Sequence, residues 1–234
     1  MNISSLINRF YHNEFSGRVF HTLVYCLQKE LKDCQSVLDI GCGPNSPLWF
    51  CQNIKYSVGI EPFKPYLEES KKRKIHTKYL DKKIEELDFA KDSFDAVIMV
   101  EVLEHLSKNT GLKIMKKAEK WAKRKVIITT PNGFFPMGRV DNNIWQKHLS
   151  GWNSTEFKKL GFSCHGLAGI KFFYKRENET ESIIDKTKTD IYANIRFKPK
   201  IPFYFINALC QTFSFYFPKI SFELFAVKEK CIKL

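Results

Sequence analysis

The chain has 234 residues, of which 44% are hydrophobic and 15% aromatic, enough to bury one sizeable core. Its formal net charge of +13 at pH 7 suggests either a polyanionic partner or a solvated basic surface. No apolar run reaches the roughly 18 to 20 residues that span a bilayer, and the amino-terminal segment MNISSLINRFYHNEF lacks the apolar stretch of a signal peptide, so we expect a cytoplasmic protein.

The positive charge does not by itself identify a partner. Lysine is spread along the whole chain, and the densest cluster, ESKKRK at 69–74, fits the solvated end of a surface helix, where cations complement the helix dipole. We therefore favour a solvated face over a nucleic-acid interface. The seven cysteines are scattered and show no C-x-x-C spacing, which indicates reduced thiols.

The first predicted element is an amphipathic amino-terminal helix within 1–33, because apolar residues recur there at helical spacing from Phe15 to Leu31. Short apolar strands and helices alternate after it. The expected strands are 36–40, 56–60, 77–80, 96–100 and 126–130, and the expected helices lie near 47–52, 65–74 and 110–123. Apolar strands separated by helices predict a parallel sheet covered on both faces.

The pattern changes after Thr130. The stretch TPNGFFPMGRVDNNIWQKHLSGW is a long loop of the kind that is usually functional or mobile. A short helix follows, in which Ser154 or Thr155 can serve as the N-cap with Glu156 in the first turn. We expect one domain over 1–234, made of the following parts: an amino-terminal helix (1–33), a core (34–175), an aromatic-rich insertion (176–218) and a last strand (219–234).

The stretch VLDIGCGPNSP joins the first strand to a glycine turn. A Walker-type phosphate loop needs a Lys-Ser or Lys-Thr pair after its glycines, and this turn has none. The dinucleotide fingerprint needs a third glycine where this chain has Ser46. The turn therefore excludes both phosphate-binding motifs.

Two acids beside this turn indicate the ligand. Asp39 lies inside the first strand, where a carboxylate is costly to bury without a cationic or hydrogen-bonding partner. Glu61 ends the second strand, the place from which an acid accepts hydrogen bonds from a ribose diol. Together they favour a nucleoside with an amino-acid tail.

The stretches VLDIGCGP, VGIEP and FDAVIMVEVLEHL, in this order, resemble the motifs of the class I S-adenosylmethionine-dependent methyltransferases. TPNG and HLSGWNSTEFKKLGF resemble the ubiquinone- and menaquinone-type small-molecule branch, methyltransferase type 11. The resemblance covers roughly 36–162. It implies an α/β fold with a Rossmann-like, seven-stranded, mostly parallel sheet, helices on both faces and a carboxy-terminal antiparallel hairpin, and S-adenosyl-L-methionine as the cofactor.

The resemblance also places the cofactor on particular residues. Gly41, Cys42 and Gly43 would bring the backbone close to the methionine part of the cofactor. Asp39 would support the turn and, directly or through water, the cofactor's amino group, and Glu61 would accept hydrogen bonds from both ribose hydroxyls.

Adenine recognition departs from the family pattern. The position at which the family often has an Asp or Asn is Lys83, which cannot accept a hydrogen bond. Either the backbone N–H of Ile84 with apolar neighbours holds the adenine, or Asp81 or Glu85 takes over the contact.

The EVLEH stretch supplies Glu101, Glu104 and His105, whose i, i+3 and i+4 spacing predicts a shared helical face. In ubiquinone-type O-methyltransferases a similar stretch is associated with a divalent metal. We favour a structural role for Glu104 and His105 and expect no metal, while Glu101 fits a place near the methionine group of the cofactor. His105 stays a candidate catalytic residue.

His148, in the loop between Trp145 and Trp152, is the second candidate catalytic residue, as a base in the acceptor pocket. The alternative is that these aromatic side chains only pack the loop. The aromatic segment 201–217, which the basic RFKPK precedes, is either a buried lid or a site of peripheral membrane contact.

We therefore expect a methyltransferase that acts on a small-molecule or lipid-linked acceptor, at oxygen. The first alternative is an RNA or other nucleic-acid methyltransferase, against which the chain lacks [DN]-P-P-[YFW] and a Pro-Cys nucleophile after the fourth strand. The second is an inactive binding protein on the same fold. The oligomeric state is not predicted.

Overall fold

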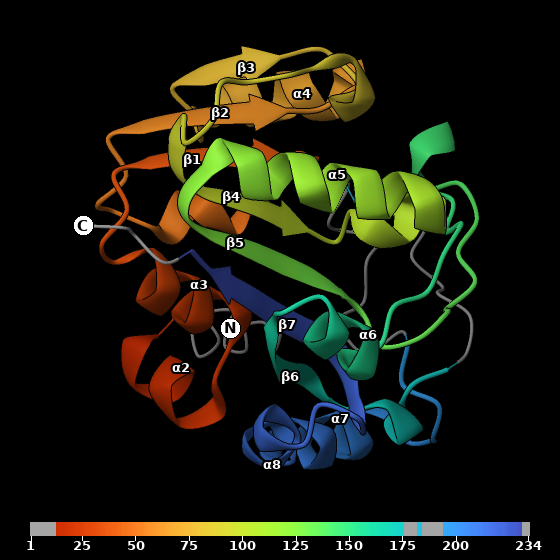
Figure 1. The fold of residues 1–234 in the computed structure, drawn as a ribbon. Coiled ribbons are helices and arrows are strands. Elements are labelled where there is room, and N and C mark those ends of the chain that lie inside the picture. The colour runs from red at the N-terminus through yellow and green to blue at the C-terminus, as the bar shows by residue number, and fades with distance from the viewer. Residues whose placement is uncertain (1–12, 176–181, 184–193, 231–234) are drawn as a thin grey trace.

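The computed structural model describes residues 13–175, 182–183 and 194–230, which build one seven-stranded sheet in the order β3-β2-β1-β4-β5-β7-β6 (Figure 1). The strands are β1 (Ser36–Ile40), β2 (Tyr56–Ile60), β3 (Lys78–Leu80), β4 (Phe94–Val100), β5 (Ala122–Pro131), β6 (Ser163–Ile170) and β7 (Ser221–Glu229). The helices are α2 (Glu14–Phe20), α3 (Leu23–Leu31), α4 (Lys64–Lys72), α5 (Lys108–Trp121), α6 (Ser154–Lys159), α7 (Lys200–Leu209) and α8 (Gln211–Tyr216). Short 3₁₀ turns are η1 (Pro47–Phe50), η2 (Ile84–Glu86), η3 (Leu103–His105), η4 (Ile144–Gln146) and η5 (Lys171–Phe173).

The predicted parallel sheet is confirmed. β1 lies between β2 and β4 and pairs in parallel with both, so its residues are buried on both faces. This explains why the sequence of β1 is apolar except at its first residue, Ser36, and at Asp39. The predicted antiparallel end is confirmed as well, because β7 lies between β5 and β6 and runs antiparallel to both.

Each face of the sheet carries its own hydrophobic core. On one face, α5 packs Ile114, Met115 and Trp121 against β1, β4 and β5. On the other, α3 packs Leu27 and Leu31 against the same strands. The two cores hold the central strands rigidly, and the site lies where those strands end.

The amino-terminal prediction of one helix within 1–33 was wrong for the described residues. Two helices, α2 and α3, are separated at His21, whose left-handed φ of 50° ends α2. Asn13 caps α2 and Thr22 caps α3 through their side chains. Phe15 is 78% exposed although its spacing placed it on the buried face. Residues 1–12 lie outside the described part.

Two other local predictions need correction. The expected helix near 47–52 is the 3₁₀ turn η1, which begins at Pro47 with the Ser46 side chain as its cap. The N-cap of α6 is Asn153, not Ser154 or Thr155, and Glu156 completes a capping box with it. Part of the expected insertion, 176–181 and 184–193, lies outside the described residues. Its last part forms α7 and α8.

Strand β6 contains a bulge that α7 and α8 fill with polar side chains. Between the paired positions Leu167 and Ile170, Ala168 and Gly169 adopt left-handed φ values of 59° and 73°. Asn207 Oδ1 accepts from Ile170 N at 2.7 Å, and its Nδ2 donates to Ala168 O at 3.2 Å. Gln211 Oε1 accepts from Gly169 N. The bulge therefore depends on α7 and α8 for its backbone hydrogen bonds.

We predict that Asn207→Leu lowers the free energy of unfolding by about 1–3 kcal/mol, because it leaves the Ile170 backbone amide of β6 without its hydrogen-bond acceptor. Urea denaturation followed by circular dichroism measures this. The matched control is Leu209→Asn on the exposed side of the same helix, for which we expect a change within about 0.5 kcal/mol. Equal stability of the two variants would contradict the proposed bond between α7 and the bulge.

Candidate functional site

Two adjoining cavities open at the carboxyl ends of β1, β2 and β4, with volumes of about 410 and 360 Å³. Gly41, Glu61, Glu101, His105 and Gln146 line both of them. Together the cavities form one cleft of the size that small-molecule ligands occupy, at the edge where ligands bind in open α/β sheets. All seven predicted cofactor residues line it, and so do both candidate catalytic histidines.

The glycine turn requires both glycines. Gly41 and Gly43 have φ values of 65° and 55°, which residues with a Cβ rarely adopt. A Cβ on Gly41 would lie 2.6 Å from Cγ2 of Val102. A Cβ on Gly43 would meet nothing within 4 Å, so Gly43 exposes its backbone to the first cavity. Cys42 is buried between them, and burial holds the pKa of its thiol well above the ordinary value, which makes it unreactive.

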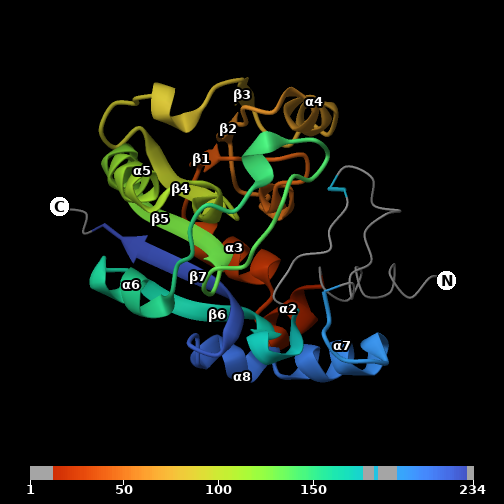
Figure 2. The same cartoon turned by 90° about the vertical axis from the view of Figure 1, so that its right-hand side faces the viewer.

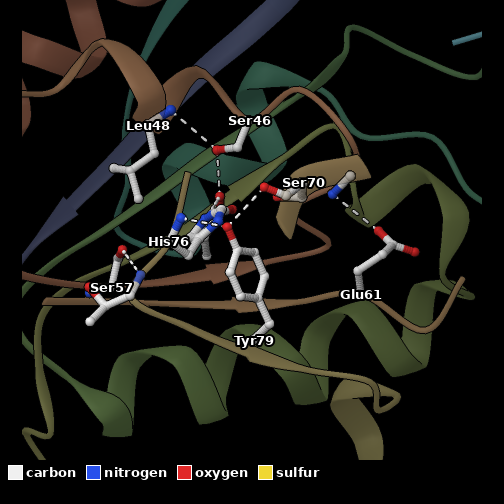
Figure 3. A network of polar contacts seen from close by, with 10 residues as sticks. Ser46, Leu48, Ser57, Glu61, Ser70, His76 and Tyr79 are labelled. Carbon is white, nitrogen blue, oxygen red and sulfur yellow. Dashed lines mark hydrogen bonds and ion pairs between the residues drawn. The ribbon is translucent and has the colours of Figure 1, made fainter. Parts of the chain in front are cut away.

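Asp39 finds its partners inside the protein. Its Oδ2 accepts from the Ser46 hydroxyl at 2.5 Å and lies 2.9 Å from Nε2 of His76, with both ring and carboxylate fully buried (Figure 3). The Ser46 hydroxyl in turn accepts from Leu48 N at 3.2 Å. The sequence suggested that a ligand could supply a cationic partner for Asp39. The structure shows that protein groups already contact this carboxylate, and that it stabilises the turn through Ser46.

Sequence reasoning missed His76. It lies in the loop before β3, 37 positions from Asp39, and nothing in its spacing marks it as a partner. Its backbone N–H donates to the Tyr79 hydroxyl at 2.9 Å, which donates to Ser70 O at 2.9 Å, so the network of Figure 3 reaches α4. The ring lies 3.0 Å from the point where a Cβ on Gly59 would be, which explains the glycine inside β2.

Glu61 links the glycine turn to the loop after β2. Its Oε2 accepts from Gly43 N at 3.1 Å and its Oε1 accepts from Phe63 N at 2.9 Å. The side chain is nearly buried, and this burial raises the pKa of its carboxyl to about 7 despite the two hydrogen bonds. Glu61 thus faces both cavities with a carboxyl group that changes charge near neutral pH.

The second cavity contains the residues expected on the adenine side. Ile84 is buried and lines it together with Lys83 and Glu85. The Lys83 ammonium group lies 4.7 Å from the ring centroid of Trp145, a cation–π contact. The lysine thus has a defined partner in the long loop, and an apolar and aromatic wall is available to a planar ring.

EVLEH does not form the helical face that its spacing suggested. Glu101 has a left-handed φ of 54° and Leu103–His105 is a 3₁₀ turn, so the three side chains diverge from helical positions. Such strain in a residue with a Cβ is typical of functional sites. The Thr129 hydroxyl donates to Glu101 Oε1 at 3.1 Å, and the Glu101 backbone N–H lies 3.2 Å from the same hydroxyl.

Three carboxyl groups meet beneath the first cavity. Glu101 contacts Glu104 and also Glu223 of β7, a residue that sequence reasoning missed. Desolvation of the carboxyl group raises the pKa of Glu101 to about 7, although the residue as a whole is exposed, and desolvation holds the pKa values of Glu104 and Glu223 well above the ordinary value. One oxygen each of Glu104 and Glu223 is buried without a hydrogen-bond partner. The cluster therefore favours a proton or a cation.

The long loop brings His148 to His105. Glu104 O accepts from Leu149 N at 2.7 Å and from Ser150 N at 3.0 Å, which fixes the loop on η3. The two imidazole rings lie 4.8 Å apart between centroids. Nδ1 of His148 lies 2.6 Å from the Phe135 carbonyl, which can only accept, so Nδ1 carries the proton and Nε2 has a free lone pair.

The donor set fits a divalent cation. One ligand atom each from Glu104, His105 and His148 lies within 4.8 Å of the others, and Glu104 Oε1 and His105 Nδ1 are buried without partners. Burial lowers the pKa of His105 to about 4 and that of His148 below its ordinary value, so both rings are neutral at pH 7. Two imidazoles and a carboxylate suit the manganese-to-zinc series better than Mg²⁺. The sequence predicted a structural role and no metal for these residues, and the geometry adds that they could hold a cation.

Comparisons with known proteins agree with the fold. Residues 38–129 match a family model described as a methyltransferase domain. No curated protein matches the chain. The matched segment begins in β1 and ends in β5, so it contains the glycine turn, Glu61 and EVLEH.

Solved structures show the same fold at low identity. A SAM-dependent methyltransferase from Archaeoglobus fulgidus is 16% identical with a TM-score of 0.50, covering 92% of this chain and 98% of that one. The plantazolicin methyltransferase BpumL, solved with SAH, is 15% identical with a TM-score of 0.51, covering 97% and 88%. The small RNA methyltransferase HEN1 is 16% identical with a TM-score of 0.55, covering 90% of this chain and 25% of that one.

We predict that His76→Leu lowers the free energy of unfolding by about 1–3 kcal/mol, because it leaves the buried Asp39 carboxylate without its imidazole hydrogen-bond partner. In the Asp39→Asn background the same change should cost less than half as much, since no buried charge remains. Urea denaturation of the four proteins of this double-mutant cycle measures the coupling. Additive effects would show that the two side chains do not depend on each other.

Proposed function

Since the chain belongs to the class I S-adenosylmethionine-dependent methyltransferases, we propose that it transfers the methyl group of its cofactor to an oxygen of a small-molecule or lipid-linked acceptor. The observation that carries the proposal is the pair of neutral histidines, His105 and His148, beside the carboxyl cluster in the cavity that adjoins the cofactor residues. Oxygen acceptors need their proton removed or their charge stabilised, and this cluster can do both.

The cofactor lies along the glycine turn in this proposal. Gly43 leaves its backbone open to the methionine part, and Asp39 holds the turn through Ser46. Glu61 accepts hydrogen bonds from the ribose hydroxyls while it stays bound to Gly43 N. The adenine lies in the second cavity between Ile84 and Trp145. Methyl transfer is an in-line displacement, so this positioning supplies much of the catalysis.

The acceptor lies in the first cavity, whose far wall includes Phe135, Met137 and Phe222. Nε2 of His148 accepts the hydroxyl proton of the acceptor, because Nδ1 is already bound to Phe135 O. A divalent cation held by Glu104, His105 and His148 would lower the pKa of a bound hydroxyl. Either way, the neutral state of both rings keeps their lone pairs available at pH 7.

A second candidate function is methylation of an RNA hydroxyl. The net charge of +13 suits a polyanionic acceptor, and one structure with the same fold is a small RNA methyltransferase. The two candidates share the chemistry at oxygen and differ only in the acceptor. The identity of the molecule that receives the methyl group therefore distinguishes the two candidate functions.

The test is transfer of labelled methyl groups from S-adenosylmethionine into a total cell extract that is then divided into lipid, polar and nucleic-acid fractions. We expect label in the lipid or polar fraction, in a bond that resists hydroxylamine as an ether does. Label in the RNA fraction would replace the proposal with the second candidate. Binding of the cofactor without transfer into any fraction would indicate the inactive alternative.

We predict that His105→Ala and His148→Ala each lower methyl transfer at least 100-fold while cofactor binding changes less than threefold, because both act on the acceptor side. The matched control is His165→Ala in β6, outside the cleft, which should keep its activity. Chelation followed by addition of Mn²⁺, Zn²⁺ or Mg²⁺ tests the cation. Full activity of the chelated enzyme would exclude a catalytic metal and leave His148 as the base.

We predict that cofactor binding depends on pH, because the pKa of the Glu61 carboxyl group is raised. The ribose hydroxyls donate to the ionised carboxyl group, so its pKa of about 7 in the free protein must fall when the cofactor binds. Affinity should therefore decrease up to tenfold per pH unit below 7, and binding at pH 7 should release up to about half a proton.

Isothermal titration calorimetry in two buffers of different ionisation enthalpy measures this proton release. Glu61→Gln should abolish it and weaken binding at least tenfold. Glu101→Gln is the matched control, because Glu101 titrates in the same range and lines the same cleft. If release persists in Glu61→Gln and disappears in Glu101→Gln, the ribose contact is assigned to the wrong acid.

A further inference from the structure

Helices α7 and α8 direct polar residues toward the sheet and apolar residues toward solvent, which is the reverse of the usual amphipathic arrangement. The residues that face the sheet are Asn207, Gln211 and Ser214, all nearly buried and at helical spacing. They satisfy the backbone of the β6 bulge and of the turn between the helices. The inner side is therefore occupied by hydrogen bonds, so the apolar side chains lie elsewhere.

Those apolar side chains are exposed. Both views place α7 and α8 at the β6 end of the molecule, with no described element beyond them (Figures 1 and 2). We define the α7–α8 outer face as the exposed residues Ile201, Phe205, Ile206, Leu209, Phe213, Tyr216 and Phe217. Leu209 exposes 69% of its surface and Phe213 53%. So many large apolar residues on one short segment mark an interaction surface.

The neighbouring helix α2 extends this surface. The Thr212 hydroxyl of α8 donates to Val19 O at 2.8 Å, which joins the two helices. Val19 is itself exposed, as is Phe15 one turn before it. The apolar area thus continues over two elements that are far apart in the sequence.

Within the segment that carries α7 and α8, the charge has one sign. From 195 to 222 the chain contains no Asp or Glu, whereas Arg196, Lys198, Lys200 and Lys219 flank the two helices. Arg196, Lys198 and Lys219 are exposed. An apolar and aromatic face with cations at its borders matches an anionic bilayer, in which the rings enter the head-group region and the cations meet the phosphates.

We propose that the α7–α8 outer face docks this protein on the surface of an anionic lipid bilayer. The helices lie in the plane of the interface, since no helix among residues 13–175, 182–183 and 194–230 is long and apolar enough to cross a membrane. A protein partner of the same area would not require the continuous absence of acids, and for this reason the bilayer is the occupant that the charge favours.

Docking through the α7–α8 outer face also determines how far the cleft lies from the bilayer. Asn194 lines the first cavity, and α7 begins six residues later at Lys200, which an extended chain spans in at most about 20 Å. One wall of the acceptor cavity therefore lies close to the bilayer. The inference holds whatever the acceptor is, because it concerns only where the protein lies.

The test is flotation of the full chain with vesicles of phosphatidylcholine alone or with 30% phosphatidylglycerol, at about 0.1 M salt. We expect at least tenfold stronger partitioning into the anionic vesicles. The combined variant Phe205→Ser, Leu209→Ser and Phe213→Ser should lose at least tenfold, and Lys198→Gln with Lys219→Gln about fivefold per lysine. Tyr56→Ser in β2, at the far side of the sheet, is the control for the first variant.

Lys72→Gln with Lys91→Gln, two exposed lysines away from the outer face, is the charge-matched control for the second variant and should keep its partitioning. Circular dichroism verifies that each variant is folded, and cofactor binding should remain within threefold in all of them. Equal partitioning of wild type and the triple serine variant would overturn the proposal. So would a stable dimer in light scattering that the triple variant dissociates, since the outer face would then be a subunit interface.

Discussion

The burial of Asp39 is the constraint on which the glycine-turn side of the cleft depends. A carboxylate in the middle of a two-sided parallel sheet is costly unless its partners are provided, and here they come from the residue after the glycine turn and from the loop before β3. One oxygen thus connects the end of β1, the turn and the loop that leads into β3. The left-handed glycines can then face the cleft while the backbone behind them stays fixed.

The carboxyl cluster of the first cavity differs from Asp39, because some of its buried oxygens have no hydrogen-bond partner. Asp39 is satisfied, whereas Glu101, Glu104 and Glu223 lie together with raised pKa values and two unpaired oxygens. Beside them, His105 and His148 are held neutral by burial. In the proposed function, the paired Asp39 carboxylate would lie under the cofactor and the cluster with unpaired oxygens under the acceptor, which would divide binding from chemistry.

The carboxy-terminal helices show how a local irregularity in a strand can determine which side chains are exposed on a neighbouring helix. The β6 bulge exposes backbone groups that need partners, and Asn207 and Gln211 supply them. Because these polar residues face the sheet, the aromatic residues of the same helices face outward. The choice between a buried lid and an exposed apolar face was therefore made by hydrogen bonds of the sheet and not by hydrophobicity.

The sequence by itself determined the parallel strands, the antiparallel end, the resemblance to methyltransferases and the residues that line the cleft, because these follow from local periodicity and from motifs within a few positions. It could not reveal His76 or Glu223, which reach the site from 37 and more than 100 positions away and carry no spacing signal. It also misjudged the amino-terminal helices, where one left-handed residue, His21, breaks a continuous apolar pattern. Only the tertiary structure decided which acids are paired, which histidines meet and which way the aromatic segment faces, since each depends on contacts between distant strands.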